Sequence, residues 1–497
     1  MKSLIIIVQL LLIFLAGMSQ PIMESIEVYT GEELNMRNDI KIAEIFGHDE
    51  RGYYAHTLDH RDGIEFLDTE FRSVKREYLD LMDGFRNRTL LALFHFHDTI
   101  YMFTSEQRVR RMLLFVETID KNTLLQNGDE RTIMDVENLS GWISEFGFKL
   151  SRQENKLLVF SRLDVYSKNI QDYHFEMYSE GLKLNWEADQ RIVYPQRAPR
   201  ESIVKVNEEG DVFIMSLQDD QKLSSLWNAM KNRYHLLALT EKGRYNNTYL
   251  LDFPELYIRG IHIEPGSGQD LSICGFYSPT HFRAMIDGVF YMELDNEAGQ
   301  FRNQVFYEFE PWFLTEAIAQ DPKKTPEELF SFRLRHMVRR NNGDFIVLAE
   351  NEFDQDYDTY QNIIAMCFSP GGSLNWKRVI PKRQGIDPYI PFNHSSYQVH
   401  APWNSDKTYL IFNDNIKNGE WPAEDEIKSF HPNSPANLKV VGIGISGELS
   451  SSIIYRKTKR RMKTPVPLQY YDMLNHEMVI PSIRFKLYNY MKISFNE

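Results

Sequence analysis

The chain has 497 residues, and its 70 Asp and Glu outnumber its 56 Lys and Arg, so the formal net charge is −14. This acidic balance does not fit a nucleic-acid partner, because binding phosphates requires a positive surface. The two cysteines, Cys274 and Cys367, are too few for a disulfide scaffold, so we expect a core built by packing. A bridge between the two stays open, since spacing does not give their separation in the fold.

The first 19 residues have the form of a secretory signal. Lys2 is followed by the apolar run Leu4 to Leu15, and Gly17 and Ser19 are small residues ahead of a cut before Gln20. The alternative is an uncleaved membrane anchor, but the run is shorter than the ~20 residues of a spanning helix. We therefore predict a secreted or periplasmic protein without a membrane span after cleavage, whose residues 20–497 form one domain.

Hairpin patterns recur along the rest of the chain. Tyr360 to Arg383 shows the plan most clearly: an apolar run, the turn Ser369-Pro370-Gly371-Gly372, and a return strand that begins Leu374-Asn375-Trp376. Phe175 to Arg191 repeats it, with Trp186 in the place of Trp376. Because the two tryptophans recur at matching positions, we expect both to be packing residues.

Pairs of such hairpins define candidate four-stranded units. They lie near residues 41–81, 89–136, 147–195, 201–253, 256–309, 331–383 and 397–455. A four-stranded unit that recurs every 50 to 60 residues is typical of a β-propeller blade. The sequence therefore predicts an all-β propeller of about seven blades, with six or eight also open, closed by residues 25–29 and 478–495. Short helical insertions are expected at Leu223 to Asn232 and after the capping box that begins at Thr325.

The motifs SEGLKLNW and SPGGSLNW, followed by IVYP or VIPK, resemble those of exported propeller-like proteins of Bacteroidota without an assigned function. The resemblance covers about Gly147 to Lys457. It implies a secreted or periplasmic location in a Gram-negative bacterium, and it transfers no site residues.

Two patterns suggest metal ligands without completing a site. His95 and His97 share one face of a strand, but zinc needs three or four ligands. Asp354, Asp356 and Asp358 have the alternate spacing of calcium ligands, but the glycine and glutamate of a calcium loop are missing. We predict no metal and no cofactor, and no pair of catalytic carboxylates stands out.

Trp403 and Trp421 lie in polar, proline-containing loops of the seventh unit. Exposed there, they are candidate ligand-binding residues, since an indole can stack on a sugar ring or a partner's side chain. The alternative is that each packs over the edge of its own blade.

These patterns favour a binding or scaffold module for a protein or glycan partner, with no catalysis assigned. The alternative is a propeller-type glycoside hydrolase or lyase that uses carboxylates facing the channel. The two predict different channels: the enzyme needs converging carboxylates or histidines, and the module does not.

Overall fold

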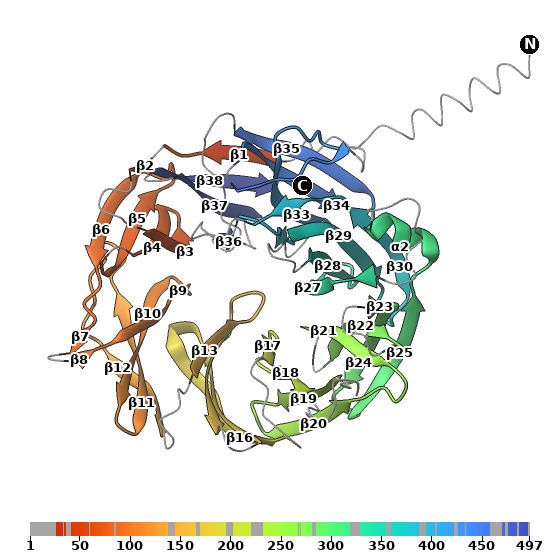
Figure 1. Cartoon of the computed structure of the whole chain (residues 1–497). Coiled ribbons are helices and arrows are strands. Elements are labelled where there is room, and N and C mark those ends of the chain that lie inside the picture. Colours follow the sequence, from red (N-terminus) through yellow and green to blue (C-terminus); the bar gives the residue numbers. More distant parts are fainter. Residues whose placement is uncertain are drawn as a thin grey trace, which may run out of the picture.

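A computed structural model shows a ring of twisted antiparallel sheets around a central channel (Figure 1). It describes residues 26–495 except for 33, 36–40, 59, 84–85, 138–144, 166–168, 195–201, 220–231, 267, 269, 281–284, 319–328, 354–358, 387–393, 403–404, 422–425, 433, 458–469, 473–475 and 485–486. The ring has eight four-stranded blades, numbered here 1 to 8 in chain order. The prediction of an all-β propeller is confirmed.

Within blades 1 to 7 the strands follow one another outward from the channel (Figure 1). Blade 1 contains β3 (Lys41–Asp49), β4 (Gly52–Leu58), β5 (Asp62–Asp68) and β6 (Ser73–Tyr78). Blade 2 contains β9 (Thr89–Phe96), β10 (Thr99–Arg108), β11 (Arg111–Ile119) and β12 (Arg131–Glu137). Blade 3 contains β13 (Glu145–Leu150), β14 (Leu157–Val165), β15 (Ile170–Ser179) and β16 (Lys183–Val193).

The next four blades repeat this order. Blade 4 contains β17 (Ser202–Val206), β18 (Val212–Asp219), β19 (Asn232–Thr240) and β20 (Tyr245–Leu251). Blade 5 contains β21 (Tyr257–Pro265), β22 (Leu271–Ser278), β24 (Gly288–Asp295) and β25 (Gln300–Glu308). Blade 6 contains β27 (Phe332–Arg339), β28 (Phe345–Phe353), β29 (Thr359–Phe368) and β30 (Leu374–Ile380). Blade 7 contains β32 (Gln398–His400), β33 (Thr408–Asn415), β34 (Ala436–Ile443) and β35 (Leu449–Lys457).

Blade 8 joins both ends of the described chain. Its strands are β36 (Tyr470–Asp472), β37 (Glu477–Arg484), β38 (Leu487–Phe495) and, from the other end, β1 (Ile26–Thr30). Strand β1 runs antiparallel to β38, with Ile26 opposite Phe495. The count of eight lies within the predicted range of six to eight. It exceeds the favoured seven because the terminal strands, interpreted from sequence as a closing clasp, form a blade of their own.

The core is divided among the blades. Buried side chains form eight clusters, each shared by two consecutive blades, and the last one joins blade 8 to blade 1 through residues such as Tyr490 and Phe71. A single twisted sheet cannot bury both of its faces, so each blade depends on both neighbours. The ring is therefore stabilised by apolar contacts around its whole circumference.

Some short elements lie outside this plan. They are β2 (Leu34–Asn35), β7 (Met82–Asp83), β8 (Arg86–Asn87), the 3₁₀ helix η2 (Glu180–Leu182), β23 (Met285–Ile286), α2 (Pro311–Ile318), β26 (Leu329–Phe330) and β31 (Gln384–Gly385). Helix α2 follows blade 5, ahead of the expected helical insertion, whose capping box at Thr325 lies outside the described residues. Most of the segment from Leu223 to Asn232 lies outside them too. No helix in the described part of the chain is long and apolar enough to cross a bilayer.

Candidate functional site

A cavity of about 460 Å³ lies in the central channel, between the innermost strands of blades 3 to 7. These strands line it because a propeller turns the first strand of every blade towards the axis. Its polar lining consists of Lys149, Arg152, Glu154, Lys205, Glu264 and His336. Its apolar lining consists of Leu150, Val204, Val206, Pro265, Met337, Val338, Val399 and Ala401. No single stretch of sequence contains the site.

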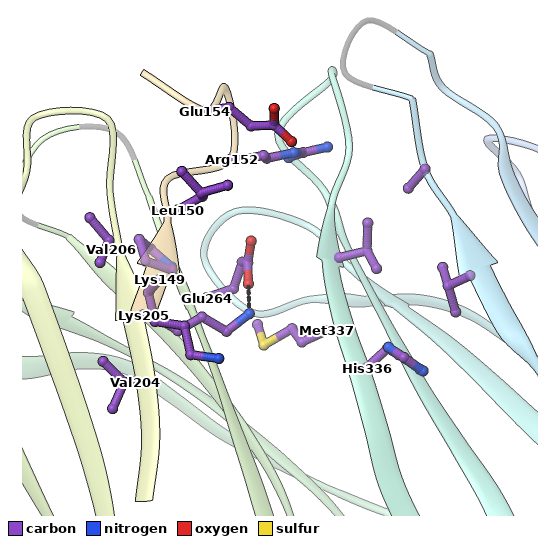
Figure 2. A pocket seen from close by; sticks show the side chains of 14 residues that line it. Lys149, Leu150, Arg152, Glu154, Val204, Lys205, Val206, Glu264, His336 and Met337 are labelled. Carbon is purple, nitrogen blue, oxygen red and sulfur yellow. Dashed lines mark hydrogen bonds and ion pairs between the residues drawn. The ribbon is translucent and has the colours of Figure 1, made fainter. Parts of the chain in front are cut away.

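Two lysines face each other across neighbouring blades (Figure 2). Lys205 of β17 forms an ion pair with Glu264 of β21, with 2.8 Å between Nζ and Oε2. Lys149 of β13 makes no hydrogen bond or ion pair with any residue that the structure describes. Its side chain stays open to solvent, yet crowding by protein atoms, followed by the charge of Lys205, lowers the pKa of its amino group. The pair thus holds an uncompensated positive charge inside the channel.

Arg152 and Glu154 lie at the mouth of the cavity (Figure 2). Burial is the main cause that lowers the pKa of the Arg152 guanidinium, while the charges of Glu264 and Glu208 act in the opposite direction. Arg152 and Lys205 therefore share the field of Glu264.

The far wall carries a neutral histidine. Burial, followed by repulsion from His262 when that ring is protonated, lowers the pKa of His336 to about 4. Burial also lowers the pKa of His262 to about 4. Both rings are therefore uncharged near neutral pH, and the His336 ring lies edge-on to Tyr397 with 5.5 Å between the ring centroids. The histidines add no charge to the site.

The sign of the charge in this part of the channel opposes that of the whole chain. The five strands β13, β17, β21, β27 and β32 carry six Lys and Arg against two Asp and Glu, although the chain has a net charge of −14. Arg333 and Arg335 pair with Glu352 of β28, which leaves Lys149, Lys205, Arg259 and Arg339 as the other cations of these strands. Low-dielectric walls strengthen such a field, so the channel favours an anion.

The carboxylates of the cavity are not arranged as a catalytic pair. Glu264 is held by Lys205, and Glu154 stands at the mouth on another blade. Glycoside hydrolysis needs one carboxyl group to donate a proton and a second to act as base or nucleophile. An ion-paired Glu264 is poorly suited to donate one, so the geometry supports binding better than glycosidic cleavage.

Among the described residues, one group brings together three possible metal ligands: His174 and Glu176 of β15 with Glu187 of β16. Both ring nitrogens of His174 are already hydrogen-bonded to carboxylates, 3.1 Å from Glu176 and 2.7 Å from Asp189. These bonds raise the pKa of His174 to about 9. At neutral pH the ring holds both protons and has no lone pair for a metal, so this is an ion-pair ladder.

The histidines singled out from sequence do not come together as ligands. His95 is largely enclosed, and burial is the main cause that lowers its pKa to about 4. His97 is exposed in the turn after β9, where its φ is 46°. No group of three possible ligands among the described residues includes either of them. The acidic triplet from Asp354 to Asp358 lies outside those residues.

Of the two candidate ligand-binding tryptophans, the structure describes Trp421 alone, and Trp421 is not among the residues that line the cavity. Trp403 is outside the described residues. Trp421 is half-buried against the cluster shared by blades 6 and 7, and the Lys439 amino group lies 5.8 Å from the centre of its ring. Ligand binding by these residues stays a prediction. Cys274 and Cys367 are both buried as free thiols.

Sequence inspection missed Lys149, Lys205, Glu264 and His336. A weak signal was present, because each is a polar residue in the apolar first strand of its repeat. The four residues come from four different blades, so they lie close together only when the blades are arranged as a ring. Alignment of the repeats, strand by strand, would have selected these positions.

No family model and no curated protein matches this sequence. Among solved structures, the WD40 domain of SCAP from fission yeast is similar with a TM-score of 0.42 and 8% identity, over 95% of this chain and 98% of that one. An oligogalacturonate lyase in complex with manganese has a TM-score of 0.38 and 9% identity, over 94% and 99%. A Bacteroides caccae protein of unknown function has a TM-score of 0.27 and 7% identity, over 69% and 94%. Similarities this weak carry no argument about function.

Proposed function

We propose that this protein is a binding module whose central channel receives an anionic group of a protein or glycan partner. The observation that carries this proposal is the amino group of Lys149, which faces Lys205 and has no counter-charge within the described residues. An arriving carboxylate or sulfate would supply that charge. Charge-assisted hydrogen bonds of this kind are about twice as strong as neutral ones.

The surroundings of the two lysines support binding of an anion in the cavity in preference to the rest of the surface. Five blades contribute to the cavity, and its volume of about 460 Å³ suits a small ligand or the tip of a larger one. The net charge of −14 makes the rest of the molecule unattractive to anions. The signal-like segment from Met1 to Ser19 supports export, and the hairpin motifs support an origin among exported propellers of Bacteroidota.

The test is calorimetric titration of the protein with two anionic probes, a uronate trisaccharide and a short acetylated peptide with a free carboxylate. We expect Lys149→Ala to weaken binding of the preferred probe at least tenfold, and added salt to weaken it further. Lys183→Ala removes an equal charge from the outer strand β16 of the same blade and is the matched control. Equal affinities in the two variants would refute the proposal.

A second variant separates binding from the enzymatic alternative. Glu264→Gln removes the carboxylate that holds Lys205, so a binding module should take up the anionic probe more tightly. A glycoside hydrolase or lyase that used Glu264 would instead lose its activity. Release of new sugar ends by the wild type, abolished in Glu264→Gln, would favour the enzyme.

A further inference from the structure

The wall that faces the lysines is aliphatic apart from His336. Val338 of β27 and Val399 of β32 form it together with the edge of Met337, which is buried in the core shared by blades 5 and 6. Val204 and Val206, on either side of Lys205 along β17, also line the cavity and are buried in the core shared by blades 3 and 4. The described lining contains no phenylalanine, tyrosine or tryptophan. A buried sugar ring would turn several hydroxyl groups towards this wall, where His336 is the one described side chain that can form a hydrogen bond, and each hydroxyl left without a partner would weaken binding. This wall therefore disfavours a glycan as the occupant.

The cavity is thus built of two unlike halves. Lys149 and Lys205 lie on one side, and Met337 and His336 lie on the other (Figure 2). Val338, next to Met337 on β27, and Val399 of β32 add further methyl groups to the lining. A complementary ligand has a carboxylate at one end and a small aliphatic group next to it. The last residue of a polypeptide has this composition when its side chain is Val, Leu, Ile or Ala.

We infer that the occupant is the C-terminus of a partner protein, with an aliphatic last residue. This inference rests on the proposed function and narrows its ligand class. The terminal carboxylate lies between Lys149 and Lys205, and the last side chain packs on Met337, Val338 and Val399. Capture of a terminal carboxylate is an established mode of peptide recognition.

A chain terminus fits better than an internal Asp or Glu. An internal acidic residue enters with chain on both sides, and no aliphatic group accompanies its carboxylate. A terminus enters with one strand of chain, which suits a cavity of about 460 Å³ between five blades. Arg152 and Glu154 at the mouth would then lie beside the preceding residues of the peptide, where charges of both signs can meet a polar backbone.

The experiment compares matched peptides on the full protein by calorimetry and by chemical-shift changes. The probes are acetyl-Gly-Ser-Gly-Val with a free carboxylate, the same peptide as a C-terminal amide, and the free acid ending in Ser in place of Val. We expect the free acid ending in Val to bind at least tenfold more tightly than the amide, and several-fold more tightly than the peptide ending in Ser. Lys149→Ala should remove the difference between acid and amide.

The outcomes separate this inference from the proposed function. Equal binding of acid and amide overturns the inference. Binding of a uronate trisaccharide that depends on Lys149, without binding of any peptide, overturns the inference and leaves the proposed function standing. Binding of no anionic probe overturns both. If Lys149→Ala does not fold, as judged by its thermal transition, Lys149→Gln keeps the stem of the side chain and tests the same charge.

Discussion

Trp376 of blade 6 lies directly over Gly447 of blade 7. The indole Nε1 donates a 3.0 Å hydrogen bond to the carbonyl of Ile445 in the same turn, and a Cβ at position 447 would lie 2.5 Å from the indole Cδ2. Blades 3 and 4 repeat the close contact without the hydrogen bond, because a Cβ at Gly243 would lie 3.1 Å from Trp186. The recurring tryptophans are therefore interblade packing residues, as expected, and each needs a glycine in the next blade.

Replacing that glycine should destabilise the ring. Gly447 has a φ of +78°, so Gly447→Ala adds backbone strain and a clash with Trp376, and we expect a loss of about 2–4 kcal/mol. Gly181→Ala is the control, because its φ of +67° carries similar strain with open space around a Cβ. Thermal denaturation of both variants measures the difference. Equal losses would show that the indole contact contributes nothing.

A second stability test concerns a fully buried ion pair beside blade 6. The Lys382 amino group donates a hydrogen bond to Glu350, and neither side chain is exposed. Lys382→Ala removes the nearest cation from this buried carboxylate and leaves it with the Ser396 hydroxyl and with Arg335, whose Nε lies 3.8 Å away, so we expect a loss of about 3 kcal/mol. The double variant Lys382→Met with Glu350→Leu should recover most of it. A double variant no more stable than the single one would show that the pair itself is required.

The stability of the protein should fall below pH 6.5. His262 and His336 have pKa values of about 4 in the folded protein, below the ordinary value of ~6.5. Between these pH values the two histidines bind protons in the unfolded chain but not in the folded chain, so protonation favours unfolding. Each contributes a slope of up to about 1.4 kcal/mol per pH unit between pH 6.5 and 4. Melting temperatures measured across this window should fall less steeply for His336→Gln. A slope equal to that of the wild type would contradict the assignment.

Anion binding should have its own pH limit. Because burial and the charge of Lys205 lower the pKa of Lys149, its amino group loses its proton at a lower pH than an ordinary lysine does. Affinity for an anionic peptide should then fall in alkaline solution before the ordinary lysine value of ~10.4 is reached. An arginine keeps its charge throughout this range, so Lys149→Arg should still bind the anionic peptide at a pH where the wild type no longer does. Parallel pH profiles for wild type and Lys149→Arg would rule out this lysine as the titrating group.

The sequence revealed the blades better than the site, for a physical reason. Each of blades 1 to 7 is contiguous, so its hairpins leave a local pattern such as the one around Trp376. Blade 8 combines β1 with three strands from the other end, and no contiguous repeat records it. The cavity is still less local, since Lys149, Lys205 and His336 are separated by whole blades. Their charge is informative only once the ring brings them together.

The pairing of β1 with β38 also constrains how the protein is made. Ile26 meets Phe495, so blade 8 cannot form until almost the whole chain has left the ribosome. Contacts between such distant residues form slowly, and the exposed edge of β38 can meanwhile pair with another chain. During synthesis there is thus a period in which blades 1 to 7 can form but the ring is still open. Joining the two ends and opening the chain between two other blades would make the last blade contiguous and shorten that interval.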